Sequence, residues 1–326
     1  ALYDIHVVGI SLKGVWIYLD LDHLLSLTTI EAPSHHSPCG LYQEGSGVQL
    51  CVDHKKIFLD VIFPVLHGPN GEDGTLQGLC DSMNVPCVGS GVLASATCMD
   101  KDIFKAYMMH VGIPVVPYIR VDACDPLISY EEASRILQSS TLFIKPSFMG
   151  SSVGIGKVTE EQTFHKALLE AFQYGHKVII EKAVVGREIE CALLGNGPYE
   201  ASTLCEIIPT HDFYSYEAKY LDPEGAVFKM NPVLESGMLE RIQDISKKVA
   251  KAMACKGMVR VDFFVADQIY VNEVNTIPGF TAISMYPQLW QHQGLSLKDL
   301  CHKLIDLALD DFNRKQSYCL MPSPVS

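Results

Sequence analysis

The sequence carries no excess of basic residues. Among its 326 residues, 25 are Lys or Arg and 38 are Asp or Glu, which gives a formal net charge of −13. Proteins that bind nucleic acids normally present a basic face. This charge balance therefore argues against a nucleic-acid partner, although it allows a local cationic pocket inside an acidic protein.

Long apolar runs are also absent. No stretch approaches the roughly 20 apolar residues of a membrane-spanning helix, and the opening "ALYDIHVVGISLKGVW" has no basic region followed by a long apolar one, as a signal peptide would. We expect no membrane partner and a cytoplasmic location. Because a strand-like run, "IHVVGI", begins almost at once and no initiator methionine precedes it, we also expect further residues upstream.

Paired metal-binding or redox motifs are missing too. The 11 cysteines are scattered without a Cys-x-x-Cys pair, mostly in apolar surroundings such as "GLCDSM" and "KAMACKG". This pattern is typical of reduced core thiols in a cytosolic protein. The histidines show no HExxH or CxxC–HxxxH spacing, which argues against a structural zinc site.

Hydrophobic periodicity alternates between strands and helices, and the chain length predicts two or three domains. In the first part, buried strands are predicted at "IHVVGI", "IFLDVIFPVL" and "PCVGS", with a helix at "GTLQGLCDSMN" and an excursion or loop over residues 26–50. This order predicts an α/β fold with a mainly parallel sheet.

A helix is predicted in "SATCMDKDIFKAYMMHVGIP", and it should end at Gly112 and Pro114. The pattern of predicted elements changes after this helix. A small αβ module follows, in which the "TEEQ" capping box at Thr159 is expected to start a helix. The remaining predicted elements are the strands in "VVPYIRV" and "KVIIEKAVVGREIECALLG", the helices "SYEEASRILQ", "GMLERIQDISKKVAKAMAC" and "SLKDLCHKLIDLALDDF", and a hairpin of "MVRVDFFVA" with "QIYVNEVNT".

The stretch "FIKPSFMGSSVGIGKV", residues 143–158, has several interpretations. "GSSVG" matches the G-x-S-x-G nucleophile elbow of hydrolases, with Ser152 as nucleophile, but a strand-like run follows it where the elbow needs a helix. A Walker P-loop fails, because Ser151 and Val158 stand where Gly and Ser or Thr are required. A hairpin lid is favoured, in which bared backbone N–H groups and Lys145 bind phosphate. A plain hairpin is the alternative.

The hairpin over residues 259–276 predicts a polar face. Because side chains alternate along a strand, Arg260 and Asp262 should share one face with Glu273 and Asn275 of the partner strand. Buried carboxylates need compensation, and oxygen ligands beside nucleotide phosphates suit Mg²⁺. The alternative is a surface sheet in which Arg260 pairs with a carboxylate. The Pro–Gly turn in "NEVNTIPGF" would expose amides to an oxyanion.

Two further clusters are weaker signals. In "IIEKAVVGREIE", Glu181 and Glu188 flank an apolar wall, an arrangement that suits an adenosine with its amino and ribose hydroxyl groups. The aromatic stretch "YSYEAKYL" is either an exposed loop or a lid that covers a reaction.

Taken in order, these segments resemble the ATP-grasp fold and, more narrowly, the D-alanine–D-alanine ligase family. The resemblance covers nearly the whole chain and rests on "HGPNGEDG", "MDKDIFK", "IKPSFMGSSVGI", "EKAVVGREIE", "FYSYEAKY", "RVDFF" and "NEVNTIPGFTAIS". It implies an N-terminal parallel α/β domain over residues 1–99, a small central ATP-grasp lid domain over 100–185, a C-terminal ATP-grasp domain over 186–316 and a tail over 317–326.

The resemblance also implies a site for ATP and two Mg²⁺ ions, for which Mn²⁺ can substitute. The implied nucleotide residues are Lys101 and Lys145 at the phosphates, Ser151 and Ser152 in the lid, Glu181, Lys182 and Val184 at the adenine, and Glu188 at the ribose. The implied metal ligands are Asp262, Glu273 and Asn275.

A second set of implied residues serves the substrates and the chemistry. Arg260 and the Gly279 amide would bind the oxyanion. Ser284 would bind the carboxylate of the second D-alanine, and His67 would lie beside the first D-alanine. Lys219 and Tyr220 would come from the lid loop, with Tyr220 hydrogen-bonding toward Ser151. The implied reaction joins two D-alanines through an acyl phosphate, for peptidoglycan precursors. A homodimer is implied by the family alone.

The chain departs from the family pattern at three places, and two alternative functions stay open. The family's Gly-Gly-x-Ser-x-Glu segment has no counterpart before "LYDIHVVGI", and Phe148–Met149 and Ile277 replace more polar residues. A ligase that takes D-lactate or D-serine as second substrate is one alternative. A catalytically silent ATP-binding module is another.

Overall fold

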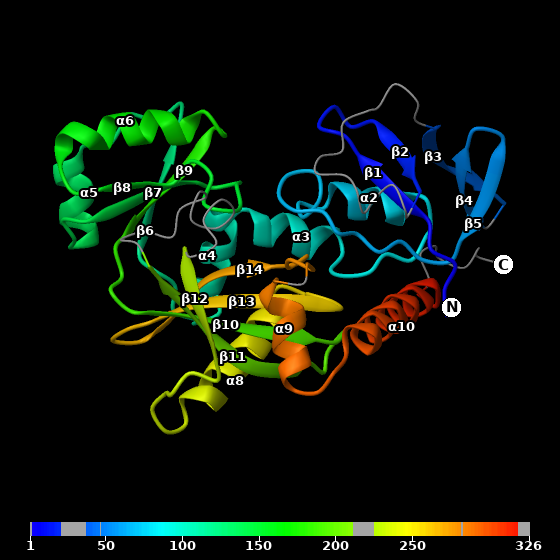
Figure 1. Ribbon diagram of the computed structural model, residues 1–326. Helices are drawn as coiled ribbons and strands as arrows, with labels where there is room; N and C mark the ends of the chain where they lie inside the picture. Colours follow the sequence, from blue (N-terminus) through cyan, green and yellow to red (C-terminus); the bar gives the residue numbers. More distant parts are fainter. Residues whose placement is uncertain (1, 21–36, 46, 211–224, 282, 319–326) are drawn as a thin grey trace, which may run out of the picture. The chain divides into compact units, whose positions relative to one another are not determined.

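The computed structural model describes residues 2–20, 37–45, 47–210, 225–281 and 283–318 (Figure 1). The chain divides into two compact units. The smaller contains residues 1–62 and 79–86, and the larger contains residues 63–78 and 87–326. The three-part division drawn from the sequence stays a prediction, and each unit is described by itself below.

The smaller unit is built on a five-stranded sheet whose neighbouring strands all pair antiparallel, in the order β1-β2-β3-β4-β5. Its strands are β1 (Val7–Ile10), β2 (Trp16–Leu19), β3 (Ser37–Glu44), β4 (Gly47–Val52) and β5 (Lys55–Leu59). The mainly parallel sheet predicted here is therefore wrong for the described residues. Short turns at Gly45 and Asp53, both with positive φ, join successive strands into hairpins, which only antiparallel pairing allows.

Two local predictions in this region are also corrected. The loop predicted over residues 26–50 contains β3 and most of β4, and the strand predicted in "IFLDVIFPVL" ends at Leu59. Beyond Leu59 the chain reaches Pro64, which cannot donate a ladder hydrogen bond. The helix predicted in "GTLQGLCDSMN" is confirmed as α2 (Thr75–Ser82).

The first sheet of the larger unit has four strands in the order β6-β9-β7-β8. Its strands are β6 (Tyr118–Asp122), β7 (Leu142–Pro146), β8 (Gly156–Val158) and β9 (Lys177–Lys182). Helices α5 (Tyr130–Leu137) and α6 (Glu161–Phe172) cover it (Figure 1) and bury Leu137 and Phe164 against strand residues such as Ile144. This is the small αβ module that the sequence predicts.

The predicted capping box at Thr159 is wrong. Helix α6 begins two residues later, with Glu160 at the N-cap and no side-chain capping bond. The Thr159 carbonyl accepts a hydrogen bond from the Tyr130 hydroxyl at 2.8 Å, and the Thr163 hydroxyl donates to the Glu160 carbonyl at 3.1 Å. Tertiary contact with α5 thus sets where the chain enters the helix.

The second sheet of the larger unit has five strands in the order β12-β11-β10-β13-β14. They are β10 (Arg187–Leu194), β11 (Glu200–Pro209), β12 (Ala226–Met230), β13 (Met258–Val265) and β14 (Ile269–Asn275). Helix α8 (Met238–Ala252) packs Ile242 and Val249 into the same core as Val261 and Phe263 of β13. The predicted hairpin at residues 259–276 is confirmed as β13 and β14.

The helix predicted in "SATCMDKDIFKAYMMHVGIP" is two helices, α3 (Val92–Met99) and α4 (Lys101–His110). Asp100 separates them in an extended conformation, and its side chain accepts hydrogen bonds from the backbone N–H groups of Asp102 and Ile103. The final helices are α9 (Met285–His292) and α10 (Leu297–Gln316).

Two features are absent from the described residues. None of the ten described cysteines forms a disulfide. Among the described helices, none combines the length and apolar character that crossing a membrane requires.

Candidate active site

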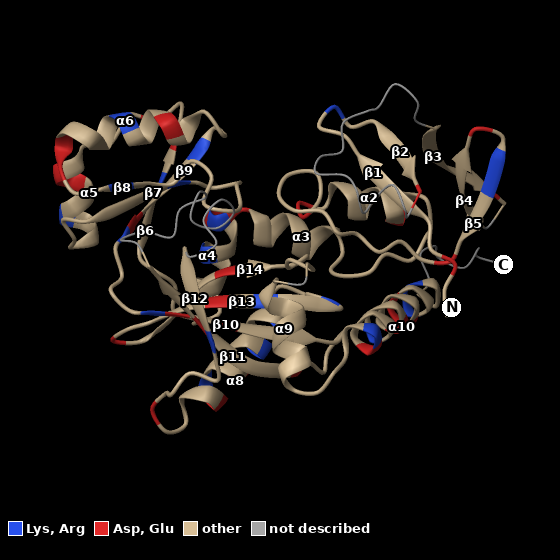
Figure 2. Cartoon of the chain, viewed as in Figure 1, with Lys and Arg blue, Asp and Glu red and all other residues tan. Residues whose placement is uncertain are grey.

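The polar face of the β13–β14 hairpin has the predicted composition. In the antiparallel register, Arg260 lies opposite Asn275 and Asp262 opposite Glu273. The intervening Val259, Val261 and Phe263 are buried, which places the polar residues on the other face of the sheet. Acidic and basic residues lie along β13 and β14 (Figure 2). An arginine, two carboxylates and an amide therefore meet on one side of the sheet.

Arg260 is held rigidly within this face. Its Nε and a terminal nitrogen each lie 2.8 Å from an oxygen of Asp262, and Nε lies 3.2 Å from Glu190. Burial disfavours the guanidinium charge, but Asp262 and Glu190 outweigh burial and raise the pKa of Arg260. The group is therefore a permanent cation, aimed by a two-pronged hydrogen bond. This pairing is the one named in the surface-sheet alternative.

The oxygen donors on this face fit a hard divalent cation. Asp262 and Glu273 face each other across the hairpin, and the Asn275 amide donates to Asp262 at 3.0 Å, which leaves its own carbonyl oxygen as a ligand. No group of three or more His, Cys, Asp or Glu within the described ranges could hold a metal alone. A metal here would draw further oxygens from Asn275 and from a phosphate, which suits Mg²⁺.

Lys101 connects this face to the lid. Its ammonium lies 3.8 Å from Glu273 and donates a 2.5 Å hydrogen bond to the Met149 carbonyl, while its backbone N–H binds the Ser147 carbonyl at 2.9 Å. Lys101 is the first residue of α4, directly after the Asp100 cap. The helix start therefore sets the place of a cation between the carboxylates and the lid.

The predicted lid is a β-hairpin formed by β7 and β8. At its tip Ser151, Ser152 and Gly154 all have positive φ, between 55° and 69°. A side chain at Gly154 would meet the Tyr174 ring at 2.6 Å, so only glycine fits there. The turn leads into β8 instead of a helix, and the nucleophile elbow proposed for Ser152 therefore lacks its helix.

Lys145 and Glu181 meet in a buried ion-pair cluster. The Lys145 ammonium lies 2.5 Å from one Glu181 oxygen, and the ammonium of Lys105 lies 2.6 Å from the other. Burial alone would raise the pKa of Glu181, but the two ammonium groups lower it to about 2. The carboxylate assigned to the adenine amino group is thus already the counter-ion of two lysines.

Lys105 is a residue that the sequence reasoning missed. It lies four residues after Lys101 on α4 and is buried between Phe104 and Met108 of the core. A lysine between two core residues of a helix is the signal that could have identified it, because an unpaired buried ammonium is costly. It requires a carboxylate, and Glu181 supplies one.

The residues assigned to the adenosine lie at the passage between the two sheets. Lys182 ends β9, Glu188 lies on β10 opposite Phe264, and Val184 is in the link between these strands. The Lys182 ammonium lies 5.9 Å from the centre of the Tyr270 ring. β9 and β10 belong to different sheets, so these residues flank the point at which the chain passes from one sheet to the other.

The residues assigned to the substrates gather around the loop after β14. A side chain on Gly279 would meet the Ser284 hydroxyl at 2.7 Å, so glycine gives this hydroxyl its space. The Ser284 oxygen accepts a 3.0 Å hydrogen bond from the Thr281 N–H. His67 is exposed as a residue, but partial desolvation of its ring, together with the charge of Arg260, lowers its pKa against the opposing effect of a backbone hydrogen bond with Ile277.

Glu72 is a second residue that the sequence reasoning missed. Its carboxylate accepts a 2.6 Å hydrogen bond from the Gly68 N–H, and burial raises its pKa to about 7, with the charge of Glu273 adding to the shift. Its position within "HGPNGEDG", next to His67 in the fold, was the available signal. Lys219 and Tyr220 lie outside the described residues.

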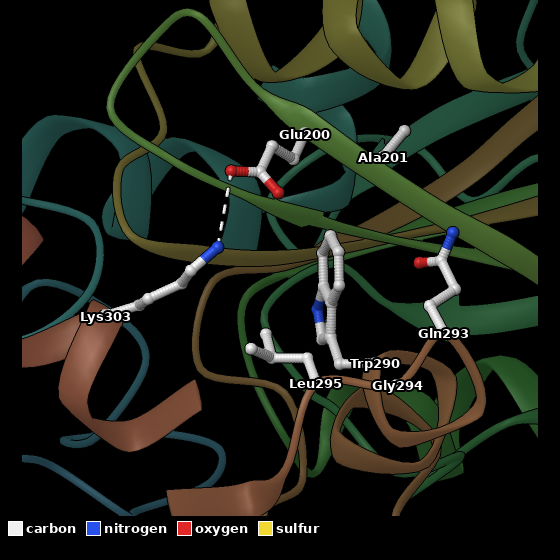
Figure 3. A pocket seen from close by; sticks show the side chains of 7 residues that line it. All are labelled: Glu200, Ala201, Trp290, Gln293, Gly294, Leu295 and Lys303. Carbon is white, nitrogen blue, oxygen red and sulfur yellow. Dashed lines mark ion pairs between the residues drawn. The ribbon is translucent and has the colours of Figure 1, made fainter. Parts of the chain in front are cut away.

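A separate cavity of about 370 Å³ lies away from these residues, between the start of β11 and the α9–α10 connection (Figure 3). Its rim carries an ion pair of 3.6 Å between Glu200 and Lys303, and Trp290 forms one wall. None of the predicted site residues lines it.

Comparison with known proteins identifies the family. The family models "D-ala D-ala ligase N-terminus" and "D-ala D-ala ligase C-terminus" match residues 1–90 and 107–306. The D-alanine–D-alanine ligase of Oceanobacillus iheyensis is 43% identical, over 96% of this chain and 88% of that protein.

Solved structures agree with the sequence matches. The D-alanine–D-alanine ligase of Coxiella burnetii superposes with a TM-score of 0.83 at 36% identity, over 96% of this chain and 86% of that one. The VanG D-Ala:D-Ser ligase of Enterococcus faecalis superposes with a TM-score of 0.80 at 35% identity, over 94% and 90%. The ATP-grasp fold predicted from the sequence is confirmed, and the chain belongs to the D-alanine–D-alanine ligase family.

Proposed function

We propose that this chain is an ATP-dependent ligase that joins two D-alanines into D-alanyl-D-alanine, for peptidoglycan precursors. The observation that carries the proposal is the convergence of Arg260, Asp262, Glu273 and Asn275 on one sheet face, with Lys101 between that face and a glycine- and serine-rich lid. Membership of the family supplies the substrate class.

The first step follows from the charges. A carboxylate oxygen of one D-alanine attacks the γ-phosphorus of ATP, and the bond from this phosphorus to the oxygen of the β-phosphate breaks. The products are ADP and the acyl phosphate of D-alanine. Lys101 and Lys145 neutralise the crowded phosphate oxygens, since phosphoryl transfer depends mainly on positioning and electrostatics. Asp262, Glu273 and Asn275 would hold two Mg²⁺ ions, which supply further positive charge to these oxygens.

The second step forms the peptide bond. The amine of the second D-alanine attacks the acyl carbon, and phosphate leaves after a tetrahedral oxyanion has formed. Arg260 and the Gly279 N–H would bind that oxyanion, and Ser284 would hold the carboxylate of the attacking D-alanine. The lid with Ser151 and Ser152 would keep water from the acyl phosphate.

The other assigned roles complete the proposal. The adenine would lie against Glu181, Lys182 and Val184, and the ribose against Glu188. His67 would lie beside the first D-alanine, and Lys219 and Tyr220 would close over the reaction. A central lid domain at residues 100–185, a cytoplasmic location and a homodimer also belong to the proposal.

An assay of the full-length protein with ATP, Mg²⁺ and D-alanine tests the function. We expect one ADP and one phosphate for each dipeptide formed. Further assays that contain D-serine or D-lactate beside D-alanine distinguish the related ligases. A ligase of that kind would release ADP only when D-serine or D-lactate is present. ATP binding without turnover in every mixture would identify a silent module and contradict the proposal.

The Glu273→Gln variant tests the assigned metal site. We expect turnover to fall on the order of 100-fold or more, because a carboxylate ligand of the phosphate-bound cation is lost. The fold should be retained, since Gln has nearly the same shape. The matched control is Glu170→Gln, which removes an exposed carboxylate of α6 that pairs with Lys166 at 3.6 Å. Normal turnover in Glu273→Gln would refute the metal assignment.

A further inference from the structure

The cluster of Lys105, Glu181 and Lys145 has one carboxylate for two ammonium groups. Lys105 comes from α4, Lys145 from β7 and Glu181 from β9, so three elements of the larger unit converge on it. The Nζ–O distances are 2.6 Å and 2.5 Å, one to each oxygen of Glu181. Within this cluster, two ammonium groups therefore share a single carboxylate.

The two lysines are not equivalent. The Lys105 side chain is 1% exposed and the Glu181 side chain 2%, whereas that of Lys145 is 11% exposed. Burial lowers the pKa of Lys105, while for Lys145 the opposing effect of burial is outweighed by Glu181, with further contributions from Glu273 and Glu188. Lys145 thus faces the site that we assign to the nucleotide, and Lys105 faces only the interior.

The position of Lys145 in the chain adds to this asymmetry. It lies on β7, the strand that runs into the lid, and it pairs with Ile179 while Phe143 pairs with Glu181. Lys105 lies in the middle of a helix whose neighbours Phe104 and Met108 are in the main core. Lys145 is thus the last residue but one of a strand that leads into the lid, whereas Lys105 is enclosed within α4 and the core.

We propose that Lys105 is a positioning residue that stays with Glu181 as its fixed counter-ion, so that Lys145 can turn to a phosphate of ATP without leaving a buried carboxylate unpaired. The inference rests on the proposed function for the identity of the nucleotide. Without Lys105, Lys145 would be the remaining ammonium group described beside Glu181. Each contact of Lys145 with a phosphate would then leave the buried Glu181 carboxylate unpaired, which is strongly unfavourable.

Nucleotide affinity of the Lys105→Met variant tests the inference. We expect its affinity for ATP, measured by calorimetry without turnover, to fall at least about tenfold. Its affinity for adenosine, which has no phosphate, should stay within about twofold, because adenosine never draws Lys145 from Glu181. A general loss of structure would weaken both ligands together. Lys166→Met, which removes an exposed lysine of α6, is the matched control.

A double variant separates charge balance from packing. In Lys105→Met with Glu181→Gln the cluster itself contains no carboxylate, Lys145 is available to phosphate, and the Gln oxygen can still accept a hydrogen bond from adenine. We expect the double variant to recover most of the ATP affinity that Lys105→Met loses. ATP affinity as low as in Lys105→Met would overturn the inference.

The melting temperature and ATP affinity of Lys145→Met provide a second test, which applies even if Lys105→Met does not fold. Lys105 still neutralises Glu181 in Lys145→Met, so this variant should melt close to the unaltered protein while losing ATP affinity. If both single variants unfold, the two lysines are equivalent partners of Glu181 and the inference is wrong. Wild-type ATP affinity in Lys105→Met, or equal losses for ATP and adenosine, would also refute it.

These measurements are independent of ligase activity. If the unaltered protein binds ATP but forms no dipeptide, the proposed function fails while the comparison of ATP with adenosine remains informative. If dipeptide forms at normal rates in Lys105→Met at low ATP concentration, the positioning role fails while the proposed function stands.

Discussion

At the scale of single residues, the alternation of a strand was enough to bring Arg260, Asp262, Glu273 and Asn275 together. Strand side chains repeat every two positions, so the residues that share a face follow from their spacing along the chain. The same reasoning could not find the partnership of Lys105 with Glu181, because helix α4 and strand β9 meet only through tertiary packing. Glu72 escaped for the same reason, since its buried state depends on the loop around His67.

Glu72 predicts a dependence of stability on pH. Its pKa is raised from 4.5 to about 7 in the folded protein, so between these values the folded state binds more protons than the unfolded state. The free energy of unfolding should therefore fall as pH rises from about 4.5 to 7, by up to about 3 kcal/mol from this group. Urea unfolding across this range, without nucleotide or divalent cation, measures the effect.

The Glu72→Gln variant isolates that contribution. Gln keeps an oxygen for the Gly68 N–H but cannot ionise, so this variant should be the more stable protein at pH 7, and its stability should vary less between pH 4.5 and 7. The control is Glu170→Gln, an exposed carboxylate. An unchanged pH profile in Glu72→Gln would show that Glu72 is ionised in the folded protein at neutral pH.

At the scale of elements, hairpins and helices in residues 100–316 were largely predictable because their signals are local. The β13–β14 and β7–β8 hairpins and helices α5, α8 and α10 lie where the sequence places them. The break between α3 and α4 was not predicted, since no Pro or Gly marks it. Asp100 makes the break by capping α4 while it also accepts a 2.7 Å hydrogen bond from Ser147 and pairs with Lys177 at 2.7 Å.

Asp100 therefore predicts a graded series of variants. Asp100→Ala loses the cap, the Ser147 bond and the Lys177 pair, and we expect it to cost about 2–3 kcal/mol of unfolding free energy. Asp100→Asn keeps an oxygen for the cap and should lose about half as much. Ser129→Ala, which removes the exposed N-cap of helix α5, is the control and should cost about 1 kcal/mol. Equal losses for Asp100→Ala and Ser129→Ala would show that Asp100 acts as a cap alone.

At the scale of the whole molecule, the sheet of the smaller unit was the part that sequence reasoning predicted wrongly. Strand β3 has an intermediate or exposed residue at every position, so no buried stripe marks it. Backbone pairing with β2 and β4 holds it in the sheet. Hydrophobic periodicity identifies strands that have one face buried in a core. A strand that is held mainly by backbone pairing with its neighbours lacks this periodicity and is missed.

Nucleotide binding should slow hydrogen exchange in the larger unit. Every described residue that we assign to ATP lies within residues 63–78 and 87–326. At an ATP concentration 100 times its dissociation constant, binding should stabilise this unit by about 2.7 kcal/mol. Hydrogen exchange should therefore slow in β7, β9, β13 and β14. We expect little change in β3 to β5, and protection confined to those strands would contradict the placement of the site.

The hydrogen bond from the Lys101 ammonium to the Met149 carbonyl joins the start of α4 to the lid hairpin. Under the function that we propose, a phosphate bound by this ammonium would compete with the Met149 carbonyl for its protons. Nucleotide binding and the contact between α4 and the lid would then be linked through one side chain.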